Sequence, residues 1–295
     1  MPTLREVRNR ISGVKKTQKI TKAMKMVAAA KLRRAQLAVL AARPDARGMK
    51  ALLQHLLPMV EPGSEPLLEA RPLQRLGLVV VTSDRGMCGA FNANVIRAVQ
   101  AHMAVVMPDV HTPSSVHLFL VGKKGADYFT KRGLPVAASH PGFFDQLTFG
   151  EALEVAREVI GLFLRGDIDR VDLIYNEFKS VSQQRIVIEQ YLPLVPEVSP
   201  SETPVHPAHY IYEPSEKELL TALIPKYLNF SLWRILLESN ASEQGARMVA
   251  MENATENARE LIETLQLQYN KARQAAITKE LLEVVSGAEA QAGAG

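Results

Sequence analysis

MENATENARELIETLQLQYNKARQAAI, residues 251–277, is the stretch that decides the fold. It lies inside a longer segment, residues 226–286, which contains no proline and a single glycine, Gly245. As one helix of about 60 residues rising about 1.5 Å each, the segment would extend roughly 90 Å. A helix this long cannot bury its own apolar side, so a second long helix must pack against it.

Two sets of residues recur in this segment at seven-residue spacing. The first set is Met251, Ala258, Leu265 and Ala272, and the second is Ala254, Leu261, Gln268, Ala275 and Leu282. This spacing is typical of the seam of a coiled coil rather than of a helix that wraps around a core. Both sets are therefore expected to face a partner helix.

The partner helix is predicted at residues 4–43, which contain no proline and only one glycine, Gly13. The residues Leu4, Val7, Ile11 and Val14 follow a heptad, which continues on Gln18, Thr21 and Lys25, while the apolar residues shift to Ile20, Met24 and Val27. A change of phase of this kind predicts a seam that drifts around the helix. Helices from the two ends of one chain pair antiparallel if the middle folds back.

The middle of the chain alternates strands and helices. Apolar runs at 76–82 and 116–121 predict buried strands, and 136–138 a third short one; helices are expected at about 93–103 and at 149–164. The runs at 171–178 and 185–192 predict an antiparallel pair. This order indicates a Rossmann-like α/β domain, and the pair Ser215 and Glu218 predicts a capping box at the start of the C-terminal helix.

The predicted fold class is α/β plus a long antiparallel two-helix coiled coil. Its predicted parts are an N-terminal coiled-coil helix at 1–58, a linker at 59–75, the central α/β domain at 76–193, a proline-rich linker at 194–214, a C-terminal coiled-coil helix at 215–287 and a disordered tail at 288–295.

Composition points to an ordered soluble protein kept in a reducing compartment. Hydrophobic residues make up 47% of the 295 residues, no apolar run reaches the length of a membrane span, and Cys88 is the single cysteine. The N-terminus is basic without the apolar block of a secretory signal. We therefore expect a bacterial-type cytoplasmic protein that reaches a membrane surface only through partners.

Charge is distributed unevenly along the chain. Residues 1–50 hold fourteen Lys and Arg against Glu6 and Asp45, a net of +12, while the remaining residues carry 21 Lys and Arg against 29 Asp and Glu, a net of −8. Such a cationic helix suits nucleic acid, anionic lipid or an acidic protein surface, or is a solvated helix face. Nucleic acid is the weaker hypothesis because residues 1–50 contain no aromatic residue for stacking.

The turn TSDRGMCGAFN, residues 82–92, follows a predicted strand and precedes a helix, where a phosphate loop would lie. Neither the Walker nor the dinucleotide pattern is present, since only Gly86 and Gly89 occur and no lysine follows. A structural turn is favoured, with a Rossmann-like nucleotide-binding enzyme as the alternative. No catalytic residue, cofactor or metal site is predicted: Cys88 has no neighbouring base, and His206 and His209 lie in the proline-rich linker.

Three separated motifs resemble one family. They are KITKAMKMVAAAKL at 19–32, the turn at 83–92, and ASEQGARMVAM at 241–251 with YNKARQAAIT at 269–278. In this order they closely resemble the gamma chain of F-type ATP synthases of bacterial type, from residue 1 to about 287. Met87 and Gly245 depart from the family pattern, which has leucine and alanine more often at these positions.

The resemblance implies a non-catalytic rotor shaft. In this family the two terminal helices form the coiled coil, whose C-terminal end penetrates the hexamer of alternating alpha and beta chains. The α/β domain lies beside the epsilon chain and the ring of c subunits, at the cytoplasmic face of the cell membrane. Rotation driven by proton or sodium flow then forces the beta chains through their conformations.

The resemblance also implies contact residues. Arg273 and Gln274 would bond to the catch loop of a beta chain, with Thr278 and Glu280 close by. Met24, Lys25 and Arg85 would lie near the acidic C-terminal lever of beta. Each exposed ionic contact would contribute only ~0.5 kcal/mol, so that none would lock the shaft.

Overall fold

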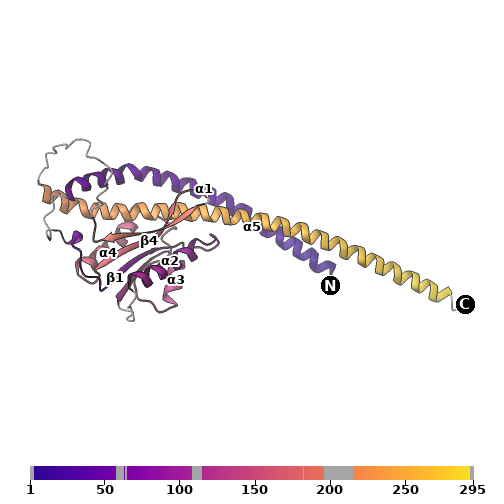
Figure 1. Cartoon of the computed structure of the whole chain (residues 1–295). Coiled ribbons are helices and arrows are strands. Elements are labelled where there is room, and N and C mark those ends of the chain that lie inside the picture. The colour runs from indigo at the N-terminus through magenta and orange to yellow at the C-terminus, as the bar shows by residue number, and fades with distance from the viewer. Residues whose placement is uncertain are drawn as a thin grey trace. The chain divides into compact units, whose positions relative to one another are not determined.

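The computed structural model describes residues 3–57, 63, 65–107, 115–181, 183–195 and 215–292. The chain divides into two compact units, which we call the coiled-coil unit (Met1–Val27 with Met248–Gly295) and the sheet unit (Ala28–Arg247). The long helices α1 (Leu4–Leu56) and α5 (Glu216–Ala292) contribute to both units (Figure 1). Residues 59–62 and 196–214 of the predicted linkers lie outside the described residues, and the division predicted from those linkers stays a prediction.

The sheet unit contains a five-stranded sheet. Its strands are β1 (Leu76–Val81), β2 (Val116–Val121), β3 (Val136–His140), β4 (Arg170–Phe178) and β5 (Gln184–Leu192), in the spatial order β3-β2-β1-β4-β5. The first four are parallel and β5 pairs antiparallel with β4. The connections are α2 (Phe91–Val106), α3 (Lys123–Thr130) and α4 (Phe149–Leu164), with a short 3-10 turn, η2 (Pro66–Leu68), before β1. The predicted α/β fold is confirmed.

Each face of this sheet has its own core, because alternate residues of a strand point to opposite faces. One core joins strand residues Leu78, Leu118 and Ile174 to Val95 and Val99 of α2. The opposite core joins strand residues to α4, to the beginning of α5 and to the end of α1, and includes Val79, Phe119, Leu173, Val155, Val159, Leu228, Leu232, Leu53 and Leu56. The long helices are therefore anchored on one face of the sheet.

The beginning of α5 is capped as the sequence predicted. The backbone amide of Glu218 donates to Oγ of Ser215 at 3.3 Å. Further along, α5 becomes buried on all sides, since each residue from Ala241 to Arg247 is buried. A surface helix buries only one stripe, so this stretch is enclosed by the rest of the sheet unit.

In the coiled-coil unit α1 and α5 run antiparallel. Arg8 contacts Tyr269, Thr21 contacts Thr255 and Lys25 contacts Glu252, so rising numbers on α1 meet falling numbers on α5. The predicted antiparallel pairing of the terminal helices is confirmed.

The predicted drift of the α1 seam is wrong. Thr21 is buried and Gln18 and Lys25 are partly buried. Of the apolar residues, Ile20 and Val27 are 60% and 57% exposed and only Met24 is partly buried. The heptad therefore continues unchanged with polar residues in it. These side chains are tolerated because they find partners across the seam, which the apolar pattern of one helix cannot reveal.

The second predicted set on α5 is also wrong. Leu261 and Leu282 are 44% and 59% exposed, while Thr255 and Tyr269 are partly buried and Ile262 is buried. The seam residues of α5 are Met251, Thr255, Ala258, Ile262, Leu265, Tyr269 and Ala272, which include the whole of the predicted first set. Thr255 and Tyr269 were not predicted as seam residues, because a pattern of purely apolar residues leaves out amphipathic side chains.

The C-terminal part of α5 extends well past the N-terminus of α1 within the coiled-coil unit (Figure 1). Helix α5 ends at Ala292, so the disordered tail expected from residue 288 is wrong for 288–292, while 293–295 lie outside the described residues. Alanine, glutamate and glutamine, which dominate these positions, are strong helix formers. Among the described residues, no helix is long and apolar enough to cross a membrane.

Candidate functional site

The turn at 82–92 lies at the carboxyl end of β1, the strand at which the strand order of the sheet reverses. Strand β1 is hydrogen-bonded to β2 on one side and to β4 on the other. The chain passes from β1 to β2 and β3 on one side of β1 and then returns to β4 on its other side. In open parallel sheets, ligands bind in the crevice outside the strand ends at this kind of switch point. The turn is therefore the place at which a nucleotide site would be sought.

Asp84 anchors the turn through its own carboxylate. Its oxygens accept hydrogen bonds from the backbone amides of Lys123 (2.9 Å), Gly142 (2.6 Å) and Phe144 (2.9 Å). These amides belong to the beginning of α3 and to the loop after β3, so one side chain ties together three loops. A carboxylate on backbone amides is a strong, charge-assisted arrangement.

The remaining donors at the beginning of α3 are bonded internally as well. The amide of Lys124 donates to the carbonyl of Ser83 at 3.0 Å, and that of Gly125 donates to Oγ1 of Thr82 at 2.8 Å. Helix N-termini bind phosphate through such amides. The amides of Lys124 and Gly125 are already bonded to the turn, so they hold it in place, as expected of a structural turn.

Cys88 is buried within the turn. Its thiol lies 3.3 Å from Nδ2 of Asn92 and 3.7 Å from Oγ of Ser83, and it packs with Phe91 and Ala246. Burial raises the pKa of the Cys88 thiol above its ordinary value, although the hydrogen bond with Ser83 opposes the shift. A neutral, enclosed thiol is a poor nucleophile, so the side chain serves packing.

Arg247 connects this turn to α5. Its guanidinium donates to the carbonyl oxygens of Gly86 at 2.6 Å and Arg85 at 3.1 Å, and to Oε1 of Glu243 at 2.5 Å. Burial raises the pKa of Glu243 above its ordinary value, and the bond from Arg247 partly offsets the shift. The contact between Arg247 and the turn was not predicted. Its only signal in the sequence is the spacing of Glu243 and Arg247, four residues apart on one helix.

Two side chains of the turn point outward. The Arg85 side chain is 72% exposed and forms a surface ion pair with Asp145 at 3.0 Å. Met87 is 64% exposed and has a φ of 62°, a left-handed backbone that residues other than glycine seldom adopt. An exposed methionine beside an exposed arginine offers a surface for a partner.

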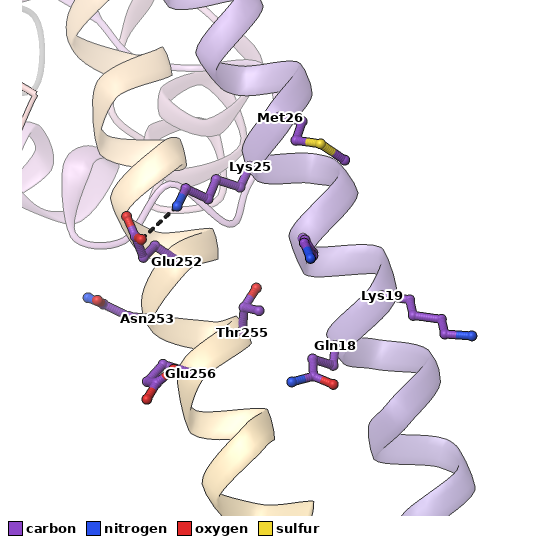
Figure 2. A pocket seen from close by; sticks show the side chains of 9 residues that line it. Gln18, Lys19, Lys25, Met26, Glu252, Asn253, Thr255 and Glu256 are labelled. Atoms are coloured by element: carbon purple, nitrogen blue, oxygen red, sulfur yellow. Dashed lines mark hydrogen bonds and ion pairs between the residues drawn. The ribbon is translucent and has the colours of Figure 1, made fainter.

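A polar groove of about 650 Å³ lies between α1 and α5 in the coiled-coil unit. Figure 2 shows Gln18 and Thr255 pointing into it, and Lys25 reaching across to Glu252 at 2.6 Å. The groove is lined by Gln18, Lys19, Lys22, Lys25, Met26, Glu252, Asn253, Thr255 and Glu256. Of the predicted lever contacts, Lys25 lines this groove and is partly buried, Met24 is partly buried, and Arg85 belongs to the sheet unit.

The predicted catch-loop contacts lie on the free part of α5. Arg273, Gln274, Thr278 and Glu280 are all exposed, and Oγ1 of Thr278 donates to the carbonyl of Gln274 at 2.9 Å. Large apolar residues are exposed beside them, among them Ile277, Leu281 and Val284. A helix end with this much exposed apolar surface is typical of an interaction site.

Comparison with known proteins identifies the family. A family model described as ATP synthase matches residues 3–291. The ATP synthase gamma chain of Prosthecochloris aestuarii is 50% identical over 294 residues, which cover 99% of this chain and 100% of that relative. The chain belongs to the ATP synthase gamma chain family. The gamma chain of Cytophaga hutchinsonii is 49% identical over 295 residues, with 98% and 99% covered.

Solved structures agree with this assignment. A chain of the Euglena gracilis mitochondrial ATP synthase, from a structure of OSCP, F1 and the c-ring, has a TM-score of 0.69 and 25% identity, with 98% of this chain and 94% of that one covered. A chain of the Tetrahymena thermophila mitochondrial ATP synthase central stalk and c-ring has a TM-score of 0.59 and 26% identity, covering 80% and 99%.

Proposed function

We propose that this chain is the central rotor shaft of a proton-translocating F-type ATP synthase, which couples rotation of the membrane ring to the conformational cycle of the catalytic beta chains. One observation carries the proposal: α5 extends past the N-terminus of α1, so its C-terminal end is exposed. The apolar residues at this end, from Leu267 to Val285, would be enclosed by a hexamer of alpha and beta chains.

The contacts of that end would be made by its polar residues. Arg273 and Gln274 are side by side and exposed, so they can donate to backbone and side-chain oxygens of a beta catch loop. Thr278 and Glu280 lie one to two turns further along the same exposed helix. Single exposed contacts of this kind contribute ~0–1 kcal/mol, which lets them break and re-form as the shaft turns.

Met24, Lys25 and Arg85 would contact the acidic lever of beta. The segment 1–50 carries a net charge of +12, and exposed lysines such as Lys19 and Lys22 line the groove next to Lys25. The exposed apolar residues Ile20 and Val27 lie on the same segment. A surface that combines cations with apolar side chains fits an acidic, amphipathic partner segment.

The chain would act without a catalytic site of its own. Its further partners would be the epsilon chain and the ring of c subunits, and it would reach the cytoplasmic face of the bacterial membrane only through that ring. Support comes from the turn after β1, whose residues Thr82, Ser83 and Asp84 accept hydrogen bonds from the first amides of α3 and so act as a structural link within the sheet unit.

The test is the double substitution Arg273→Ala with Gln274→Ala in the reconstituted complex. We expect the variant to assemble with alpha and beta chains and to hydrolyse ATP several-fold more slowly. The matched control is Arg259→Ala with Gln266→Ala, which removes an exposed arginine and an exposed glutamine from the paired part of α5. Turnover equal to that of the control would contradict the catch-loop contacts, and failure of the wild-type chain to assemble with a hexamer would contradict the shaft.

A further inference from the structure

We propose that Arg247 is a positioning residue that holds the turn at 84–87 against α5 and so presents Arg85 and Met87 to a partner protein. The inference deepens the proposed function and rests on it for the partner, which is an acidic and partly apolar protein surface. The hydrogen bonds of Arg247 carry it, since they join the helix to the backbone of the turn rather than to its side chains.

The geometry favours positioning over simple packing. The Arg247 side chain is only 10% exposed, and its guanidinium is shared between the carbonyls of Arg85 and Gly86 and the carboxylate of Glu243. The planar guanidinium holds several acceptors at fixed angles at once. The two carbonyls belong to Arg85 and Gly86, the two residues directly before Met87, so this contact fixes the direction of the backbone as it reaches Met87.

Asp84 holds the other side of the same turn. Its carboxylate is bonded to the amides of Lys123, Gly142 and Phe144, so the first residue of the turn is fixed to the sheet edge. With Asp84 and Arg247 both in place, the backbone between them is restrained at each end. The side chains of Arg85 and Met87 stay exposed at the surface, Arg85 with its ion pair to Asp145.

Strain at Met87 explains why two restraints are needed. A φ of 62° disfavours a residue with a Cβ by about 1–2 kcal/mol. Without the guanidinium, the turn would relax toward conformations that direct Met87 and Arg85 elsewhere. Arg247 thus acts on a partner through the turn rather than by direct contact.

The experiment uses the assembled complex with Arg247→Met, Arg247→Lys, Arg85→Gln and the combination of Arg247→Met with Arg85→Gln. Amide hydrogen exchange reports the turn, in peptides covering 84–92, and ATP hydrolysis reports coupling. The control is Arg259→Met, which removes an α5 arginine whose partners, Glu256 and Glu263, are on the same helix.

For Arg247→Met we expect exchange in the turn to rise about tenfold while exchange in β1 and β2 stays unchanged. Arg247→Lys, which keeps a cationic donor, should fall between wild type and Arg247→Met. Hydrolysis by Arg247→Met should fall as far as that of Arg85→Gln, and the combination should lose no more than either one, since both act through one contact.

Unchanged exchange in the turn, or an equal rise in β1 and β2, would overturn the positioning role, and Arg247→Lys decides the question if Arg247→Met does not assemble. If exchange rises in the turn but Arg85→Gln hydrolyses ATP normally, the positioning role stands and the lever contact of Arg85 fails.

Discussion

Gly245 lies in the stretch of α5 that is buried on all sides and faces the hairpin between β4 and β5. A Cβ at this position would lie 3.4 Å from a ring carbon of Phe178 and 3.5 Å from the carbonyl oxygen of Val181. These are ordinary van der Waals distances, so the site has room for alanine, the residue more common in the family. The glycine leaves the helix locally more flexible, because glycine is less favourable than alanine in a helix by about 1 kcal/mol.

Gly245→Ala should therefore raise the free energy of unfolding of the sheet unit by about 0.5–1 kcal/mol. Urea denaturation followed by circular dichroism measures it. Gly122→Ala is the contrasting control: Gly122 has a φ of 94°, and its Cβ would lie 2.1 Å from the carbonyl oxygen of Thr82, so that variant should lose at least ~2 kcal/mol. A loss of stability in Gly245→Ala would mean that the hairpin cannot accommodate a methyl group.

The roles of single side chains were the part of the site least accessible from sequence. The interpretation of the turn as structural stays a prediction, which rests on glycines that match neither phosphate-binding pattern. That Asp84 bonds to Lys123, Gly142 and Phe144 could not be predicted, since those amides come from loops about 40 and 60 residues away. The same holds for Arg247 and Gly86, which are 161 residues apart.

Among the helices and strands, the seam between α1 and α5 combines apolar and polar pairs. Oγ1 of Thr21 lies 2.7 Å from Oγ1 of Thr255. Each hydroxyl also lies within hydrogen-bond distance of a carbonyl in its own helix, that of Gln18 for Thr21 and that of Met251 for Thr255. The polar pair fixes which residues face each other, while Val7, Ile262 and Leu265 supply buried apolar area. Buried polar pairs in coiled coils specify register at some loss of stability.

Replacing both Thr21 and Thr255 by valine should therefore stabilise the coiled-coil unit by up to ~1 kcal/mol, since removing both partners of a buried hydrogen bond leaves no unsatisfied group. Hydrogen exchange of residues 3–27 and thermal unfolding of the complex measure the change. Thr255→Val alone is the control and should be close to neutral, because Thr21 keeps the carbonyl of Gln18. A double variant less stable than the single one would show that the hydroxyl pair is net stabilising.

Sequence patterns predicted where the helices and strands lie better than which face of each helix is buried. The strands, the helix at 149–164 and the pairing of the terminal helices follow from runs of apolar residues and from length. The faces of α1 could not be predicted, because Ile20 and Val27 are apolar but exposed. Apolar residues that serve a partner outside the chain look the same in sequence as residues that fill its own core.

At the level of the whole molecule, residues buried from solvent and exposed apolar residues lie in different parts of the chain. The sheet unit contains two complete cores, whereas the last part of α5 is exposed from residue 277 to 286. Near the N-terminus of α1, Arg8 contacts α5 through a hydrogen bond to Tyr269 at 2.9 Å and through its guanidinium, which lies 5.7 Å from the centre of the tyrosine ring. The exposed residues 277–286 would be covered only by partners.

Limited proteolysis with trypsin should therefore begin at Lys271, Arg273 and Lys279, all of which are exposed. Mass spectrometry of early fragments should find the C-terminal end removed while residues up to about 271 remain joined. Arg247, which is buried, is the internal control and should be cut much later. In the assembled complex the same three sites should be protected, and equal cleavage in both forms would contradict enclosure of this end.

The seven-residue repeat of the seam also gives the coiled-coil unit a handedness. Positions from Leu4 to Lys25 on α1 and from Met251 to Tyr269 on α5 keep alternating steps of three and four residues, a period of 3.5 that winds two α-helices into a left-handed supercoil. Like a two-stranded rope, such a pair tightens under torque of one sign and loosens under the other. A shaft built this way is mechanically different in its two directions of rotation, before any partner touches it.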